Sequence, residues 1–397
     1  MAVKTNYKHT ISACYIGYVT QAIIVNFAPL LFLTFQSSYN IPLSQITLLV
    51  TVNFAIQLTV DFLAAKFADS IGYRPLAVAS HLFAAAGFAG LGILPGLLPP
   101  YLGIFIPTVL YAIGGGLLEV LISPIVEACP TDSSKKSAHM SLLHSFYCWG
   151  QVFVIIVSTL FFVIFGIHNW QILAVAWAVV PLFNAVYFSQ VPIATFKNNG
   201  ENTSIKSVVS SKLFWLFLLL MMCSGASEQA MVQWASMFAE AGLKISKTAG
   251  DLAGPCLFAV LMGITRVGYS KLSEKINLRI FMMGSGCLCV IGYLLASLSP
   301  DPVIALIGCS LCGLAVGIMW PGTFSLAAAK CPNAGTALFA LLALGGDLGC
   351  SVGPTLVGIT SGISDGGIKT GILAGIVFPV LLIFGLVLLA RSHGQKT

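Results

Sequence analysis

Charged residues are scarce in this chain. They make up 8% of its 397 residues, whereas a soluble domain carries roughly a quarter. Hydrophobic residues make up 57%, and the mean hydropathy is +0.95. This composition excludes an ordinary soluble globular protein, because most of the surface must meet an apolar environment.

Motifs for nucleotide hydrolysis and for catalysis are also lacking. Without a GxxxxGK[ST] loop, the chain cannot drive transport with ATP unless a partner supplies the site. No Ser-His-Asp, His-x-x-x-His or paired-carboxylate motif lies on a polar stretch, so we expect no enzyme activity and no cofactor. The eleven cysteines lie mostly in apolar segments, without Cys/His spacing for a metal, and we expect free thiols and no metal site.

Long apolar runs dominate what is present. A run of about 20 apolar residues can cross the roughly 30 Å of hydrocarbon in a bilayer. The first run is too long for the apolar part of a signal peptide. We count twelve runs, which predict an all-α membrane protein with twelve spanning helices: 11–35, 43–66, 75–94, 101–127, 138–166, 169–190, 212–239, 248–271, 279–298, 303–329, 334–360 and 370–391.

Basic residues are distributed unevenly between the loops. One membrane side carries nearly all of them, whereas the other carries only Lys244, Lys247 and Lys369. Basic loops stay in the cytoplasm. We therefore expect a multi-pass plasma-membrane protein with both termini cytoplasmic. The net charge of +6 then reflects topology and needs no nucleic-acid partner.

The two halves of the chain are related in sequence. The polar connection 192–211 separates the halves 1–191 and 212–397, each with six expected spans. KFADSIGYR at 66–74 aligns without gaps to KLSEKINLR at 271–279, an offset of 205. This pattern predicts two pseudo-symmetric six-helix bundles, which is the plan of the major facilitator transporters.

The repeated segment carries a resemblance to that superfamily. Asp69-Ser-Ile-Gly72-Tyr-Arg74 resembles its signature Asp-x-x-Gly-x-Arg/Lys, although Ala65 replaces the usual leading glycine. Gly72 allows a tight turn, and the charged residues can bridge helix ends. We therefore assign Asp69, Arg74 and their repeat partners Glu274 and Arg279 to a cytoplasmic gate, with a solvated charged loop as the alternative.

A narrower resemblance covers most of the chain. Gly114–Pro130, His139–Gln151 and Gly225–Glu240 are similar to the fucose/glucose-type sugar–proton symporters. The resemblance implies that Glu119 lies in a central cavity. That family also has a carboxylate on the first helix, whereas residues 11–35 contain only Gln21 and Asn26 as comparable polar groups. Its proton-coupling arrangement therefore does not transfer as a whole.

The carboxylates of Glu119, Glu228 and Asp347 lie inside expected spans. Ionisable groups in hydrocarbon are costly and usually mark an ion or substrate pathway, so all three are candidates for proton coupling. We also assign Glu119 to substrate binding, as an acceptor for a solute hydroxyl group. The alternative for Glu119 is a neutral group that is hydrogen-bonded for packing. Asp347 lies in the glycine-rich LGGDLGCSVGP and is either a coupling site or the partner of Arg266; the glycines permit gating motions or close helix contact.

Polar residues repeat at helical spacing on three further segments. Glu119, Ser123 and Glu127 form one stripe, with Glu127 assigned to the gate. His144, Cys148 and Gln151 form another, and we assign His144 and Gln151 to substrate binding; a histidine held only by a hydrogen bond is the alternative. The third stripe is Asn53, Gln57 and Asp61.

Gln21 and Asn26 recur as Glu228 and Gln233 at an offset of 207. We assign these four residues and Gln229 to substrate binding, because amides and carboxylates can hold solute hydroxyl groups. Trp234 could stack on an apolar sugar face or anchor the helix at the membrane interface.

Asp61 aligns with Arg266 at the offset of 205. The two could pair when the cytoplasmic gate closes. Alternatively, Arg266 binds an anionic solute or another intramembrane carboxylate.

Together these features predict a secondary active transporter that works by alternating access between its two halves. The favoured activity is proton-coupled symport of a small polar solute such as a monosaccharide, with sodium as an alternative coupling ion. The expected surroundings are the lipid bilayer, and the expected state is a monomer. A proton-coupled exporter of hydrophobic or cationic compounds is the first alternative, and a solute sensor that does not transport is the second.

Overall fold

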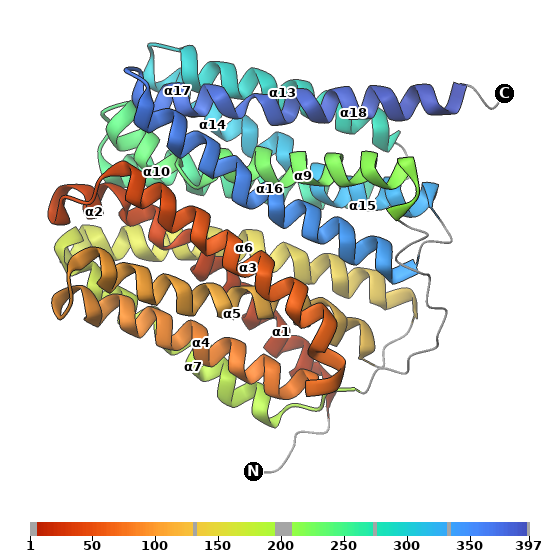
Figure 1. Ribbon diagram of the computed structural model, residues 1–397, viewed down its shortest axis with the longest axis horizontal. Helices are drawn as coiled ribbons and strands as arrows, with labels where there is room; N and C mark the ends of the chain where they lie inside the picture. Colours follow the sequence, from red (N-terminus) through yellow and green to blue (C-terminus); the bar gives the residue numbers. More distant parts are fainter. Residues whose placement is uncertain (1–5, 130–132, 195–208, 273–275, 332–334, 395–397) are drawn as a thin grey trace. The chain divides into compact units, whose positions relative to one another are not determined.

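The chain forms two compact helical units in this computed structural model (Figure 1). One unit comprises Met1–Gln45 and Val52–Asn198, and the other comprises Ile46–Thr51 and Asn199–Thr397. The structure describes residues 6–129, 133–194, 209–272, 276–331 and 335–394. Of the expected gate residues, Glu274 lies outside the described residues, and so does the side chain of Asp69.

Twelve helices in the described ranges are long and apolar enough to cross a membrane. The predicted all-α, twelve-helix membrane fold is confirmed. Large apolar side chains remain exposed along these helices, including Phe62, Ile164 and Phe183 in the first unit and Val303 and Phe384 in the second. A helix satisfies its own backbone hydrogen bonds, so such side chains can face lipid directly.

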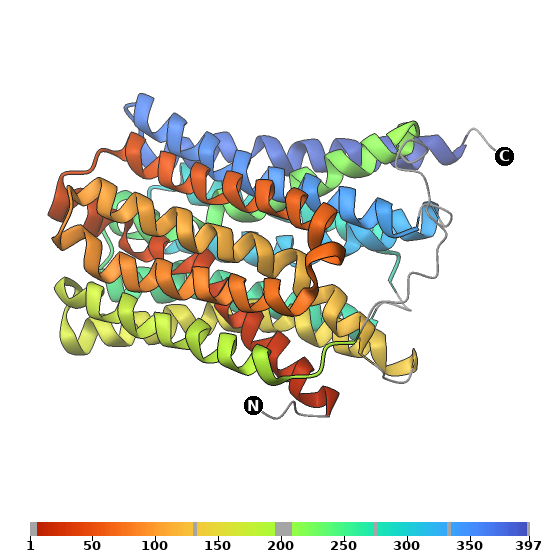
Figure 2. The ribbon, with the colours of Figure 1, turned by 60° about the horizontal axis from the view of Figure 1, so that its bottom comes forward.

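The long helices of the first unit run along roughly one direction as a bundle (Figures 1 and 2). In it, α4 packs against α5 and α7, while α1 packs against α5 and α6. The elements are α1 (Tyr7–Asn26), η1 (Ala28–Leu31), α2 (Phe32–Tyr39), α3 (Leu43–Ile71), α4 (Tyr73–Ile93), η2 (Leu94–Gly96), α5 (Pro100–Ala128), α6 (Ser133–Phe165), η3 (Ile167–Asn169) and α7 (Trp170–Gln190).

The second unit is a bundle of the same kind. Here α9 packs against α16 and α18, and α14 packs against α12 and α13. The elements are α9 (Lys212–Val232), α10 (Ala235–Met237), η4 (Phe238–Gly242), α11 (Lys247–Asp251), η5 (Leu252–Cys256), α12 (Leu257–Leu272), α13 (Leu278–Leu298), α14 (Pro302–Val316), α15 (Met319–Lys330), α16 (Gly335–Ile363), α17 (Gly367–Gly375) and α18 (Val377–Gly394).

The first spanning helix of each unit is broken at the same point of the repeat. In the first unit α1 ends at Asn26, and a 3-10 turn containing Pro29 leads into α2. In the second unit α9 ends at Val232, and Gln233 and Trp234 lead into α10. Since Asn26 and Gln233 are 207 positions apart, the two breaks are equivalent. Irregular backbone at membrane depth is typical of transporter binding sites.

Glycines hold α9 and α16 in close contact. A Cβ atom on Gly353 would lie 2.6 Å from the carbonyl oxygen of Ala226, and one on Gly349 would collide with the backbone of Met222. Gly346 likewise faces the ring of Trp320. The glycine-rich segment around Asp347 therefore brings two helix backbones together, as small residues do in membrane bundles.

The turn between α3 and α4 uses Gly72, as expected from the motif. Its φ angle is 97°, in the left-handed region that glycine tolerates and other residues rarely adopt. Directly after it, Arg74 donates a hydrogen bond from Nη2 to the carbonyl oxygen of Val191 at 2.9 Å. Arg74 thus ties the start of α4 to the end of α7 within the first unit.

Candidate functional site

A chain of buried amides links α1 to α3 in the first unit. Nε2 of Gln21 donates to Oε1 of Gln57 at 2.9 Å, and Nε2 of Gln57 donates to Oδ1 of Asn53 at 3.2 Å. All three side chains are buried. Gly115 of α5 lies against them, where a Cβ atom would be 2.8 Å from Oε1 of Gln57. Among the described residues Oε1 of Gln21 has no hydrogen-bond donor, so it can accept one from a solute.

Asn26 lies at the end of α1, just before the break. Its side chain is buried, and Nδ2 donates to the carbonyl oxygen of Ala22 at 2.9 Å. This bond holds the amide group against the last turn of the helix. Asn26 is the last polar residue of α1, five positions after Gln21.

The polar stripe of α5 meets α1 at Tyr18. The hydroxyl of Tyr18 lies 3.2 Å from Oγ of Ser123 and 3.4 Å from Nδ1 of His144 on α6. Glu119, one turn before Ser123, is half-buried, whereas His144 is exposed and so is Glu127 at the end of the stripe. Tyr18 joins two predicted site elements and was missed from the sequence, although it lies three residues before Gln21 and hence on the same helix face.

Gln151 lies two turns from His144 on α6. Its side chain is buried, and within the described ranges its Nε2 has no hydrogen-bond acceptor. A buried amide nitrogen without a protein partner is costly and commonly binds water or a ligand. Asp61, four residues after Gln57 on α3, is also buried.

The second unit carries a corresponding polar chain on α9. Nε2 of Gln233 donates to Oε1 of Gln229 at 3.0 Å, and Nε2 of Gln229 donates to Oε1 of Glu228 at 3.2 Å. Oε2 of Glu228 lies 3.5 Å from Nη2 of Arg266 on α12. All four side chains are largely buried. Glu228 is thus placed between an amide and a cation.

The two chains share one equivalent position of the repeat, because Gln21 corresponds to Glu228. Asp61, one turn after Gln57, corresponds to Arg266. In each unit a buried polar side chain of the first spanning helix contacts one of the second: Gln21 contacts Gln57, and Glu228 contacts Arg266.

Trp234 is fully buried within the second unit. Its Nε1 donates to the carbonyl oxygen of Pro354 on α16 at 2.9 Å. The indole N–H of Trp234 thus joins the end of α9 to α16. Asp347, two turns earlier on α16, is half-buried. Arg279, at the start of α13, is half-buried as well.

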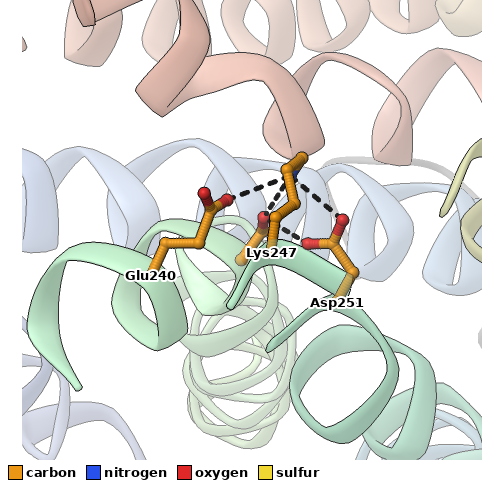
Figure 3. Close-up of polar contacts among 4 residues, drawn as sticks. Glu240, Lys247 and Asp251 are labelled. Carbon is orange, nitrogen blue, oxygen red and sulfur yellow. Dashed lines mark hydrogen bonds and ion pairs between the residues drawn. The ribbon is translucent and has the colours of Figure 1, made fainter. Parts of the chain in front are cut away.

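A second charged cluster, missed from the sequence, lies after the break in α9. Lys247 contacts the carboxylates of both Glu240 and Asp251 across η4 and α11 (Figure 3). In the part of the chain that the structure describes, no three His, Cys, Asp or Glu side chains are grouped so as to hold a metal ion.

Comparison with known proteins identifies the family. The model of the Major Facilitator Superfamily matches residues 13–354. A comparison with curated protein sequences finds no match. Solved structures with a similar fold include three transporters, each at low sequence identity.

The first is a bacterial homolog of the human lysosomal transporter Spinster, with a TM-score of 0.75, 12% identity and coverage of 98% of this chain and 97% of that one. The second is the Escherichia coli fucose:proton symporter, with a TM-score of 0.66, 15% identity and coverage of 96% and 98%. The third is a D-xylose-proton symporter, with a TM-score of 0.72, 15% identity and coverage of 94% and 95%. At such identities the likeness establishes the fold, and the match of the family model over most of the sequence establishes membership: the chain belongs to the Major Facilitator Superfamily.

Proposed function

We propose that this multi-pass membrane protein is a proton-coupled symporter of a small hydroxylated solute, such as a monosaccharide. The observation that carries the proposal is that each unit contains a buried polar chain, Gln21–Gln57–Asn53 in the first and Glu228–Gln229–Gln233 in the second. The two chains share one equivalent position of the repeat, occupied by Gln21 and Glu228. Amides offer both donors and acceptors, as the hydroxyl groups of a sugar require. An exporter of hydrophobic compounds would instead need a cavity lined mainly by apolar side chains.

Coupling in this proposal depends on the carboxylates within the spans. Glu119 is half-buried on α5, and Glu228 is buried beside Arg266 on α9 and α12. A carboxylate in this environment can gain and lose a proton as its access to water changes. The distribution of basic residues supports the plasma membrane, with both termini in the cytoplasm.

The test is uptake of labelled monosaccharides into proteoliposomes under an inward proton gradient, with the wild type, Glu119→Gln and Glu228→Gln. The loss of gradient-driven accumulation in one variant, with solute exchange across the membrane retained, would identify the coupling carboxylate. Asp365→Asn, which removes an exposed carboxylate from the loop between α16 and α17, is the matched control. The proposal fails if the wild type accumulates no sugar but expels lipophilic cations.

A further inference from the structure

Lys247 lies in a small site whose other members are oxygen atoms. Its Nζ is 3.0 Å from Oε1 of Glu240, 3.0 Å from Oδ2 of Asp251 and 3.3 Å from Oγ of Ser236. The three labelled side chains converge on one point in Figure 3. The ammonium group donates hydrogen bonds to Glu240 and Ser236, and it forms an ion pair with the carboxylate of Asp251.

The oxygen atoms of Ser236 and Asp251 are joined to each other without Lys247. Ser236 donates its hydroxyl proton to Oδ1 of Asp251 at 2.5 Å. The lone pairs of the Ser236 hydroxyl oxygen are therefore free to face the ammonium group of Lys247, as Oδ2 of Asp251 does. Asp251 is completely buried, whereas the side chains of Glu240 and Lys247 are 17% and 18% exposed. The site is thus open to solvent on the Glu240 side and closed behind Asp251.

Both carboxylates lie at π-helical segments. Glu240 is within η4, and Asp251 is the residue directly before η5. In η5 the cause is Pro255, which cannot donate the backbone hydrogen bond of a regular helix. π-Helical turns are rare and often occur where side chains serve a site, because they rotate neighbouring side chains out of the regular helical register.

We propose that Ser236, Glu240 and Asp251 form a monovalent-cation site in which the ammonium group of Lys247 is the resident, covalently attached cation. Two carboxylates and a hydroxyl are ligands that a hard cation prefers. Without the ammonium group, two negative charges would share a largely buried site, which is costly unless a cation replaces it. With Lys247 in place, the oxygen atoms of this site need no dissolved cation. The inference goes beyond the proposed symport and does not depend on it.

The test is chemical rescue of Lys247→Ala in purified, detergent-solubilised protein, read as the apparent melting temperature at constant ionic strength. Propylammonium matches the atoms that the substitution removes, and ammonium and potassium ions are close in size to the lost group. In choline chloride we expect the variant to melt well below the wild type. Propylammonium, ammonium or potassium chloride should raise its melting temperature by on the order of 5 °C and leave the wild type unchanged.

Two further variants separate a cation site from an ordinary ion pair. Lys247→Ala combined with Asp251→Asn removes a ligand and should abolish the response to all three cations. Lys244→Ala removes the same charge from an exposed residue three positions earlier and should behave as the wild type does. The proposal is overturned if Lys247→Ala responds to the cations no more than the double variant does. It is equally overturned if Lys247→Ala cannot be recovered folded in any of these salts while the double variant can.

Discussion

Arg266 directs a terminal guanidinium nitrogen to within 3.5 Å of Oε2 of Glu228 and 3.7 Å of the sulfur of Met262. The pair therefore lies between two spanning helices of the same unit, α9 and α12. A buried pair of this kind contributes little net stability, but removing one partner leaves the other charge uncompensated.

We expect Glu228→Gln and Arg266→Gln each to lower the free energy of unfolding, by about 3 kcal/mol. The double variant should recover much of this loss, because neither charge then remains buried alone. A double-mutant cycle in a detergent denaturation assay measures the coupling. Equal and additive losses would show that the pair does not interact.

Gln21→Ala should weaken solute binding while leaving the helices in place. The substitution removes the free acceptor Oε1 and the donor to Gln57, and one or two lost hydrogen bonds correspond to a KM about tenfold higher. Initial rates of solute uptake against concentration measure the change. Gln171→Ala breaks a hydrogen bond to Tyr39 in the same unit and should leave KM unchanged.

Replacing Gly353 with valine should separate α9 from α16. Even a Cβ atom at this position would lie 2.6 Å from a backbone oxygen, and overpacking of this kind costs about 1–3 kcal/mol. A lower apparent melting temperature is expected, with loss of transport if the helix pair is displaced. Gly362→Val, on the same helix with open space around it, should change neither quantity.

Asp301 caps the start of α14. Its Oδ1 accepts hydrogen bonds from the backbone N–H groups of Val303 and Ile304 at 2.8 and 3.1 Å. Asp301→Ala should therefore cost about 1 kcal/mol of stability. Asp301→Asn retains an acceptor at the N-cap and should lose less. Thermal unfolding of the three proteins would contradict this assignment if both substitutions had equal effects.

The twelve spans could be predicted from the sequence because lipid imposes a simple rule on length and hydropathy. The broken first helix of each unit could not. Pro29 gives a hint in the first unit, but nothing around Gln233 and Trp234 differs in composition from a continuous helix. At this break Trp234 donates a hydrogen bond to Pro354 of α16, which lies more than a hundred residues away in sequence.

Helical spacing found Glu228, Gln229 and Gln233 as neighbours but did not determine the partner of Arg266. Asp61, Asp347 and other carboxylates were all compatible with the sequence, since proximity between helices depends on how each is rotated. Trp234 shows the same limit, because its position on the helix did not reveal that the indole donates a hydrogen bond to α16. Whether these residues bind a solute stays a prediction.

The break at Gln233 and Trp234 divides the first spanning helix of the second unit into two pieces, α9 before it and α10 with η4 after it. On one side, α9 packs closely against α16 at glycines of α16, where a Cβ atom would collide with the backbone of α9. On the other, α10 and η4 are joined to α11 by the charges around Lys247. A tilt of one piece against the other must therefore be taken up at the short joint between them, where Gln233 ends the amide chain. The position of the Gln233 side chain would then change with the angle between the two pieces.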